Sequence, residues 1–595
     1  MLLAFLVLIS AFLAGYSISR KFFKAELFAP SFLFGIVAFS YFLFALSSLL
    51  GYSTISISGA ILISLLIFAF ILKDEKIRFK SITTSLFSPD SFAIFLLAFL
   101  LMGYVASHAL GYSDGFAVIS QDWAVHLGIT NSLAEGNFPP QYPYLSQAPL
   151  SYYYFSHLFI SSLVKGGLDS LTAYPLVIVL LISSIITSIY STSRNLLKSK
   201  LGGVLAIFLA FFSSACAACL INDAAWFSPF FSFSANSGFP LRPIVLSFAF
   251  NQLPMALSFL FFAVFLKAFL ELEGEKKFLI LGTLIALLPM FGPFFYALMF
   301  IFITYGILFE RNRRFYVGGA IAIFAGALQY LFFFSEKATP SILRFIHFEL
   351  YAHLESIPDL LLFWLQNAGG HIAFALLALY FVKIRADLKN LLLTSGLLYA
   401  LSSFIIVFPD MWANEKFFMP FFILLGVFAA AFVLHIISLK PIIRYAGFAI
   451  LLIALLSTAH QFKFFLPPSP TIAQQSLGDA QTFEACKWIK ENTPQNSVFL
   501  TPESLEESGC IYAYAGRLAA YSNPYWIWSQ GFDKDQLESE QKQMLAGDTS
   551  LLAKYRINYV FANRELEGKI GESLRKLLTL VYSNEGVTVY QLDVR

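Results

Sequence analysis

The sequence predicts a mainly α-helical bundle of transmembrane helices that carries a C-terminal α/β domain. Hydrophobic residues make up 58% of the 595 residues and charged residues only 13%, whereas soluble domains contain about 25% charged residues. Apolar runs long enough to cross a bilayer, roughly 17–25 residues, recur along the chain. These runs do not alternate with a period of two, so we expect helices rather than barrel strands.

Thirteen or fourteen spans are expected, because the run interrupted at Gly292–Pro293 can form one span or two. A single span there would reverse the orientation of everything downstream. Residues 1–18 lack a preceding basic segment, so we expect an uncleaved span rather than a signal peptide. The predicted spans lie near 2–18, 27–49, 57–72, 90–110, 171–190, 202–221, 242–266, 278–291, 293–309, 315–334, 359–382, 391–408, 417–438 and 445–461.

Basic residues are concentrated in alternate loops, for example at Arg194 and Lys198, and again at Arg313 and Arg314. Cytoplasmic loops of membrane proteins are enriched in Lys and Arg. The pattern therefore predicts an integral plasma-membrane protein whose N-terminus, long loop and C-terminal tail lie outside the cytoplasm. It also favours two spans at Gly292–Pro293, because only then do all the basic clusters fall on one side.

Four regions are expected: N-terminal transmembrane helices over 1–110, a large extracytoplasmic loop over 111–170, a transmembrane core over 171–466, and an extracytoplasmic α/β domain over 472–595. For this last region we predict helices at 479–491, 534–545 and 564–577, and strands at 497–501, 558–562, 578–582 and 587–591. Cys486 and Cys510 can form a disulfide if the tail is extracytoplasmic.

The long loop contains the main catalytic candidate, Asp122. Residues 122–135 are expected to form a helix at the membrane interface, with Asp122 and His126 one turn apart on the same face. A carboxylate near the membrane boundary is costly, and it can serve as a general base toward a hydroxyl group. The alternative role is a helix cap. His126 and His157 can orient a phosphate or hydrogen-bond an acceptor, or else serve a structural role.

Three consecutive tyrosines follow in the same loop. Ser151 is a suitable N-cap for a short helix over 152–164, which would place Tyr153 and His157 on one face. Tyrosines are common in the interfacial aromatic belt. Because Tyr152, Tyr153 and Tyr154 would point around such a helix, we expect at least one of them to face a binding cavity.

Few cations are available in the loops predicted to lie outside. Arg242, Arg344 and Lys416 are the best placed to bind an anionic phosphate, and arginine can do so in a bidentate manner. Asp410 belongs to a polar loop just before Lys416. Phosphate is a competent leaving group, so we expect that no metal is required. A divalent ion is possible, and Asp223 is then its candidate ligand.

Several of these residues together resemble a known family. An acid at the start of a juxtamembrane helix, then Phe138-Pro139-Pro140, and then the run from Ser151 to His157 (SYYYFSH) resemble the YYY-type family of prokaryotic membrane proteins. The family pattern has Asn and Gly at the positions occupied here by Ser151 and Ser156. That family looks like part of the GT-C superfamily of polytopic glycosyltransferases.

The resemblance implies a GT-C-like bundle that transfers a sugar from a polyprenyl-phosphate donor, with inversion, and with Asp122 as the base. The acceptor would be a glycan, a lipid or a protein, and no nucleic acid is implied. The tyrosines would be recognition residues. Two other classes stay open: a lipid or polysaccharide transporter or flippase, and a non-catalytic receptor or scaffold that uses the C-terminal domain.

Overall fold

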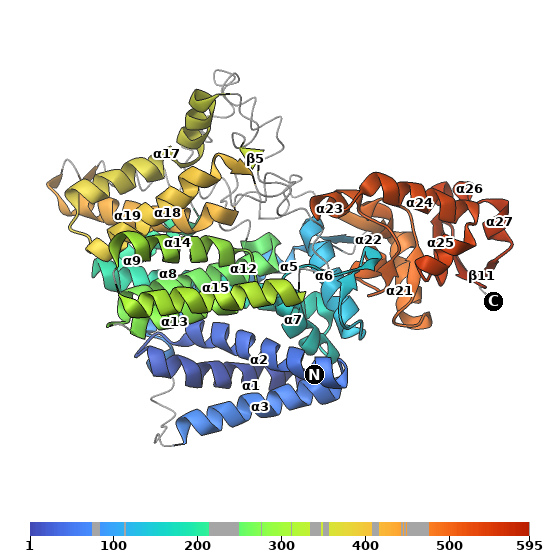
Figure 1. Cartoon of the computed structure of the whole chain (residues 1–595), viewed down its shortest axis with the longest axis horizontal. Helices are drawn as coiled ribbons and strands as arrows, with labels where there is room; N and C mark the ends of the chain where they lie inside the picture. The colour runs from blue at the N-terminus through green and yellow to red at the C-terminus, as the bar shows by residue number, and fades with distance from the viewer. Residues whose placement is uncertain are drawn as a thin grey trace.

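The protein consists of a helical bundle with further layers stacked on one end of it (Figure 1). The computed structural model describes residues 1–595 except 74–83, 112–114, 119, 213–248, 275, 311, 334–346, 349–355, 407–415, 442–443, 446–447, 449–474 and 594–595. The bundle helices lie side by side, and the C-terminal domain is at the far end of the molecule, beyond α6 and α7.

The described part of the bundle contains seven helices that are long and apolar enough to cross a membrane: α1 (Leu2–Phe22), α2 (Phe28–Leu50), α3 (Thr54–Leu72), α5 (Pro89–Ser107), α8 (Ser170–Leu197), α12 (Leu253–Glu271) and α19 (Met419–Ser438). The bundle also includes α9 (Lys200–Ile207), the π-helical turn η1 (Phe208–Phe212), α13 (Lys276–Leu287), α14 (Phe294–Phe309), α15 (Arg313–Phe333), α17 (Ile357–Phe381) and α18 (Ala386–Ser402).

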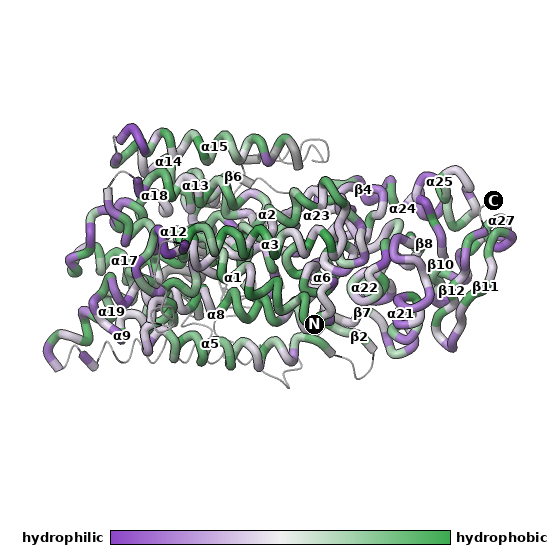
Figure 2. Tube along the Cα trace, turned by 90° about the horizontal axis from the view of Figure 1, so that it is seen from below, coloured by the Kyte–Doolittle hydropathy of each residue, from purple (hydrophilic) through white to green (hydrophobic). Residues whose placement is uncertain are grey.

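Hydrophobic residues cover the bundle helices, whereas hydrophilic residues gather in the C-terminal domain and at the opposite helix ends (Figure 2). This distribution confirms the predicted class, a polytopic helical bundle with a C-terminal α/β domain. The predicted span 391–408 is shorter in the structure, because α18 ends at Ser402 and a two-residue strand, β6 (Ile405–Ile406), pairs with β5 (His347–Phe348). The predicted span 445–461 lies almost wholly outside the described residues.

The chain reverses direction at Gly292–Pro293, as the two-span prediction requires. At the start of α13, the Lys277 ammonium lies 4.0 Å from the ring centre of Phe269, near the end of α12. At the start of α14, Phe294 packs on Phe259 with ring centres 5.0 Å apart, and further along, Tyr305 packs on Phe269 at 5.2 Å. Therefore α13 runs antiparallel to α12 and α14 runs parallel to it.

Charged side chains at the bundle end far from the C-terminal domain form ion pairs with one another. Arg194, in the last turn of α8, contacts the buried Glu26 carboxylate at 3.1 Å. Lys200 contacts Asp90 at 2.8 Å. On α12, Lys267 is buried and pairs with Glu271 at 2.7 Å. We call this region the paired end of the bundle.

Between the bundle and the C-terminal domain lies a layer that we call the connecting layer. The Met1 amino group donates a hydrogen bond to the Gly166 carbonyl in this layer (2.8 Å), so the N-terminus is at this end. The connecting layer comprises β1 (Leu110–Gly111), β2 (Gly115–Val118), α6 (Gln121–Ala134), β3 (Gln141–Tyr142), β4 (Leu145–Pro149) and α7 (Phe155–Lys165).

The C-terminal domain contains a five-stranded sheet in the order β11-β12-β10-β8-β9, in which β8 is parallel to both neighbours and the other pairs are antiparallel. Its elements are β7 (Gln475–Asp479), α21 (Ala480–Asn492), β8 (Val498–Leu500), α22 (Leu505–Ala513), β9 (Leu518–Ala519), α23 (Pro524–Ser529), α24 (Lys534–Ala546), α25 (Thr549–Lys554), β10 (Tyr559–Asn563), α26 (Arg564–Lys569), α27 (Glu572–Arg575), β11 (Leu578–Ser583) and β12 (Val587–Leu592).

The four predicted strands of this domain correspond to β8, β10, β11 and β12, and two of the predicted helices correspond to α21 and α24. The third predicted helical stretch, 564–577, is divided into two short helices, α26 and α27. The chain is interrupted between α26 and α27 because the Gly571 amide donates a hydrogen bond to the Leu545 carbonyl of α24 (2.9 Å). A Cβ at Gly571 would lie only 3.2 Å from the Ala546 backbone.

Backbone hydrogen bonds join the C-terminal domain to the connecting layer. Strand β7 pairs antiparallel with β2, which also pairs with β1, so one sheet combines both regions. The Ala519 amide donates to the Pro143 carbonyl (2.7 Å), and the Ser522 amide donates to the Tyr144 carbonyl (3.0 Å). The position of the domain relative to α6 is therefore set by main-chain bonds as well as by side chains.

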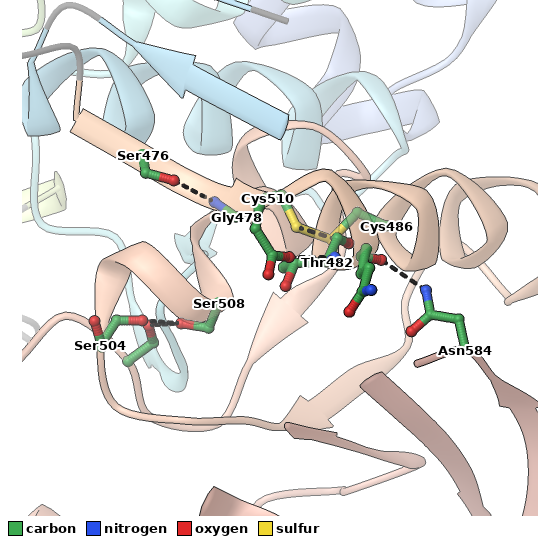
Figure 3. The surroundings of a disulfide bond; sticks show 11 residues. Ser476, Gly478, Thr482, Cys486, Ser504, Ser508, Cys510 and Asn584 are labelled. Carbon is green, nitrogen blue, oxygen red and sulfur yellow. Dashed lines mark hydrogen bonds between the residues drawn. A yellow bond between two sulfur atoms is a disulfide. The ribbon is translucent and has the colours of Figure 1, made fainter. Parts of the chain in front are cut away.

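A disulfide links α21 to α22 beside this shared sheet (Figure 3). Cys486 and Cys510 have Cα atoms 6.0 Å apart, and both residues are fully buried. At the start of α21, the Asp479 carboxylate accepts a hydrogen bond from the Thr482 amide (2.8 Å). The pairing that the sequence left open is thus made in the structure, and such bonds are typical of proteins in oxidising compartments.

Candidate active site

Helix α6 is buried inside the protein, between the bundle and the C-terminal domain (Figure 1). Every residue from Trp123 to Leu133 is buried. Helix α22 of the C-terminal domain covers its outer side: the Asn131 amide donates to the Ala513 carbonyl (2.6 Å), and a Cβ at Gly128 would lie 2.7 Å from the Tyr512 ring. The Asn131 side chain thus contacts the C-terminal domain.

Asp122 lies in the first turn of α6 and remains partly exposed. Its Oδ2 accepts a hydrogen bond from Nε2 of Gln252 (3.1 Å), the residue that precedes α12. A carboxylate is favoured at this position because the first amides of a helix carry partial positive charge. The N-cap of α6 is Ser120, so Asp122 is not the cap residue. The structure thus places it where the bundle meets the connecting layer.

His126 follows one turn later and forms a hydrogen-bonded pair with His157 of α7. Nδ1 of His126 lies 3.0 Å from Nε2 of His157, and both side chains are fully buried. Burial lowers the pKa of His157 to about 3. Burial also lowers the pKa of His126. The neighbouring His157, in its protonated form, and the Lys416 ammonium lower it further. Both imidazoles are therefore neutral near pH 7.

The three tyrosines precede α7 instead of lying on it, so the prediction of a helix over 152–164 capped by Ser151 was wrong. The helix begins at Phe155, whose amide donates to the Met290 carbonyl beyond α13 (3.2 Å). Among the ring contacts of the described residues, the Tyr152 ring is the one of the three that lies near the histidine pair, with its centre 6.0 Å from that of His126 and 6.3 Å from that of His157. Burial, and next the charge of Asp122, raise the pKa of Tyr152.

The other two tyrosines occupy different surroundings. Tyr153 is partly buried, and its ring lies tilted against that of Tyr152, with ring centres 5.3 Å apart. It also lies within electrostatic range of Tyr296 on α14. Tyr154 is 4% exposed and packs edge-on against Phe155. The expectation that at least one tyrosine faces the candidate site therefore applies best to Tyr152.

Lys416 is the one predicted phosphate-binding cation that lies within the described residues. It is half-buried just before α19, and its charge acts on His126, so it belongs to the same neighbourhood. Arg242, Arg344, Asp410 and Asp223 lie outside the described residues. Across the part of the chain that the structure describes, no three His, Cys, Asp or Glu side chains converge as a metal site would require.

Sequence reasoning missed two residues that complete the site and a third at the far end of α6. Gln252 holds Asp122, and Trp526 of α23 faces the histidines, with its ring centre 6.4 Å from that of His126 and 6.3 Å from that of Tyr152. Arg517 is fully buried and lies 3.8 Å from Glu135 at the end of α6. The aromatic run Tyr-Trp-Ile-Trp at 525–528 was the available signal for Trp526.

A separate cleft of about 550 Å³ lies between the C-terminal domain and the start of α8. Asp169, Glu484, Lys487 and Tyr514 are among the residues that line it. None of the residues predicted to act in catalysis or binding is among them. The cleft is therefore distinct from the cluster around Asp122.

Fold and site together define a polytopic membrane protein with a buried polar cluster at one end of its bundle. Residues 36–222 match the family described as "Uncharacterized membrane protein (DUF2298)". This region includes the whole stretch from Asp122 to His157, so the resemblance to the YYY-type family of membrane proteins is confirmed over it. No curated protein matches the chain by sequence.

Among solved structures, the chain is similar to oligosaccharyltransferases of Archaeoglobus fulgidus. A complex with zinc and sulfate has a TM-score of 0.47 at 14% identity, covering 84% of this chain and 72% of that one. AglB in complex with an inhibitory peptide and a dolichol-phosphate has a TM-score of 0.48 at 13% identity, with coverage of 84% and 74%. A form tethered to an acceptor peptide has a TM-score of 0.46 at 13% identity, again with coverage of 84% and 74%.

Proposed function

We propose that this protein is a membrane glycosyltransferase that transfers a sugar from a polyprenyl-phosphate donor to an acceptor outside the cytoplasm. The observation that carries the proposal is the position of Asp122. Its carboxylate is held by Gln252 at the end of the bundle (3.1 Å), next to a cluster of buried aromatic rings and imidazoles. Aromatic faces beside a few precisely placed polar groups suit a sugar, which has both apolar and hydroxyl-bearing surfaces.

The choice of donor follows from the distribution of charge. The basic residues of the paired end support a cytoplasmic position for that end by the positive-inside rule, and we propose that Asp122 and the C-terminal domain lie outside. The disulfide between Cys486 and Cys510 is consistent with the same orientation. Nucleotide sugars are cytoplasmic, so a transferase on the outer side needs a donor already delivered across the membrane, and a lipid-linked phosphate sugar meets that need.

Asp122 acts in the proposed mechanism as the base. An acceptor hydroxyl attacks the anomeric carbon from the face opposite the phosphate, and the new C–O bond forms as the bond to the phosphate oxygen breaks. The acceptor proton goes to the Asp122 carboxylate, and the polyprenyl phosphate leaves with the electron pair of the broken bond on its phosphate oxygen. One such displacement inverts the anomeric centre. General base catalysis of this kind contributes about 10²–10⁴-fold to the rate.

The leaving phosphate needs positive charge nearby. Lys416 lies near the site, because its charge acts on His126. We propose that Arg242 and Arg344 assist it and that Asp410 orients them. Cations placed where negative charge develops stabilise the transition state. Phosphate is a competent leaving group, so we propose that a metal is not required. Asp223 is the residue to test if a divalent ion does take part.

The experiment uses the full-length protein in lipid nanodiscs, a panel of polyprenyl-phosphate sugars, and glycan, lipid and peptide acceptors. We expect transfer by wild type and a loss of at least about 100-fold in Asp122→Asn. Asp169→Asn is the matched control. Asp169 caps α8 in the connecting layer, and asparagine caps a helix about as well as aspartate.

Equal rates for wild type and folded Asp122→Asn would show that Asp122 is not the base. Absence of transfer by wild type across the whole panel would refute the glycosyltransferase and favour a transporter or flippase, or a receptor. A flippase would instead move fluorescent polyprenyl-phosphate lipids between leaflets of proteoliposomes.

A further inference from the structure

The hydrogen bonds of the histidine pair determine which ring nitrogens carry protons. Besides His126, His157 has two hydrogen-bonding neighbours: the Ser156 hydroxyl, which lies 3.4 Å from Nδ1 and can donate or accept, and the backbone carbonyl of Tyr153, one turn earlier in the chain. A carbonyl only accepts, so His157 must donate to it. Because Nε2 of His157 faces His126 at 3.0 Å, the donor is Nδ1. A neutral imidazole has one N–H and one lone pair, so Nε2 of His157 carries the lone pair.

The same reasoning extends to His126. The lone pair on Nε2 of His157 accepts the proton of Nδ1 of His126 across the 3.0 Å contact. His126 is buried and neutral, so its own Nε2 carries no proton. That nitrogen is fully buried and has no hydrogen-bond partner among the described residues. Buried polar atoms are nearly always hydrogen-bonded in native proteins, so this nitrogen indicates a place for a ligand donor.

An indole N–H from the C-terminal domain lies in the same cluster. Nε1 of Trp526 is also buried without a hydrogen-bond partner in the described part of the chain. Tyr152 lies against both His126 and Trp526, and it also lies within electrostatic range of Asp122. An acceptor, a donor and aromatic rings therefore belong to one cluster, one helical turn from the proposed base.

We infer that Nε2 of His126 accepts a hydrogen bond from a sugar hydroxyl, with His157 as the positioning residue that fixes its tautomer and with Trp526 covering the same sugar. This inference rests on the proposed function and deepens it. On this assignment His126 accepts a hydrogen bond from a hydroxyl instead of donating one to a phosphate. The hydroxyl belongs either to the donor sugar or to a glycan acceptor.

Two pairs of variants separate the role of His126 from that of its partner. An asparagine amide occupies the position of Nδ1, so His126→Asn keeps the donor to His157 and removes the acceptor at Nε2. A glutamine amide oxygen occupies the position of Nε2, so His157→Gln still accepts from His126, whereas His157→Leu does not. We expect kcat/KM to fall about 10- to 100-fold in His126→Asn and His157→Leu, and to stay within a few-fold of wild type in His157→Gln.

The KM values identify the source of the hydroxyl. A rise confined to the donor KM in His126→Asn assigns it to the donor sugar, and a rise confined to the acceptor KM assigns it to the acceptor. A deoxy sugar lacking that hydroxyl is expected to abolish the difference between wild type and His126→Asn. Wild-type kcat/KM in His126→Asn, with wild type active, would overturn the inference while leaving the proposed function intact.

A second measurement does not depend on activity. The chain has eight histidines, and ¹⁵N spectra of histidine-labelled protein in nanodiscs, assigned by the loss of signals in His126→Asn, report the protonation of each ring nitrogen. We expect His126 to be protonated on Nδ1 and unprotonated on Nε2 near pH 7. A proton on Nε2 would overturn the inference, even if no donor in the panel is used and the proposed function fails.

Discussion

The two ends of the helical bundle treat buried polar groups differently. At the paired end, the Glu26 carboxylate meets Arg194 at 3.1 Å and the buried Lys267 meets Glu271 at 2.7 Å. At the other end, Nε2 of His126 and Nε1 of Trp526 are buried without a hydrogen-bond partner among the described residues. At the paired end these buried charges have charged partners within the chain, whereas the end next to the C-terminal domain holds uncharged groups that a ligand can satisfy.

This contrast separates residues that stabilise the fold from residues that bind or react. A buried charge that loses its partner destabilises a protein strongly. An unpartnered buried donor or acceptor already lowers stability by about 1–3 kcal/mol, so removing it has little further cost to folding. Substitutions at the paired end are therefore expected to change stability, and substitutions around Asp122 to change activity.

The largest expected effect is on catalysis. Asp122→Asn should lower kcat by about 10²–10⁴-fold and leave the Tm near that of wild type, because asparagine can still accept the hydrogen bond from Gln252. Single-turnover transfer tests the fall in kcat, and thermal unfolding of the same nanodisc samples tests the unchanged Tm. A large fall in Tm would contradict the contrast, since Asp122 would then stabilise the fold.

The next effect is on stability at the paired end. Arg194→Met leaves the Glu26 carboxylate, whose side chain is 6% exposed, without its partner, and should lower the free energy of unfolding by about 3 kcal/mol. The control is Arg575→Met, which breaks the more exposed pair with Glu567 and should cost at most about 1 kcal/mol. Denaturant unfolding in detergent compares them, and equal losses would show that burial is not the cause.

The disulfide provides a smaller stability term in the C-terminal domain. Cys486 and Cys510 are separated by 24 positions, and closing a loop of this size in the unfolded chain stabilises the fold by about 3 kcal/mol or less. Cys510→Ser should therefore make the domain more sensitive to protease. A reductant should have the same effect on wild type and none on Cys510→Ser. Sensitivity of the variant to reductant would point to another thiol.

Acid should destabilise the histidine pair gradually. Burial lowers the pKa of His157 from 6.5 to about 3, and it shifts the pKa of His126 in the same direction. The unfolded chain thus takes up protons first, so the stabilisation is complete above about pH 6.5 and is lost as the pH falls toward 3, by at most about 1.4 kcal/mol per pH unit for each histidine.

Lys416 acts on His126, and Tyr152, which lies against the pair, feels the charge of Asp122, so the histidine contribution must be measured as a difference between proteins. Thermal unfolding of wild type and His157→Gln between about pH 4.5 and pH 7 provides it. The stability of wild type should fall more steeply than that of the variant. Parallel curves would show that His157 keeps an ordinary pKa in the folded protein.

The smallest expected effect is that of metal removal. If Lys416 and the loop arginines stabilise the leaving phosphate, transfer should continue in EDTA at an unchanged rate, because phosphate leaves without further activation. The same assay with added Mg²⁺ or Mn²⁺ measures any gain. Loss of activity in EDTA that is restored by a divalent ion would instead implicate Asp223.

The sequence by itself determined the class of the protein and most of its elements. Apolar runs of spanning length predict helices whatever their neighbours are, because the backbone must satisfy its hydrogen bonds within lipid. The strands β8, β10, β11 and β12 were predicted from short β-type runs rich in β-branched and aromatic residues. Asp122 and His126 could be placed on one face because helical spacing is a local property.

Only the tertiary structure decided what surrounds that face. His157 is 31 positions from His126 and Gln252 is 130 positions from Asp122, while Trp526 comes from another domain. No local pattern encodes such pairs, because they depend on how separate elements pack. The start of α7 is set in the same way: the amide of Phe155 bonds to the Met290 carbonyl, and this long-range contact decides that the three tyrosines precede the helix.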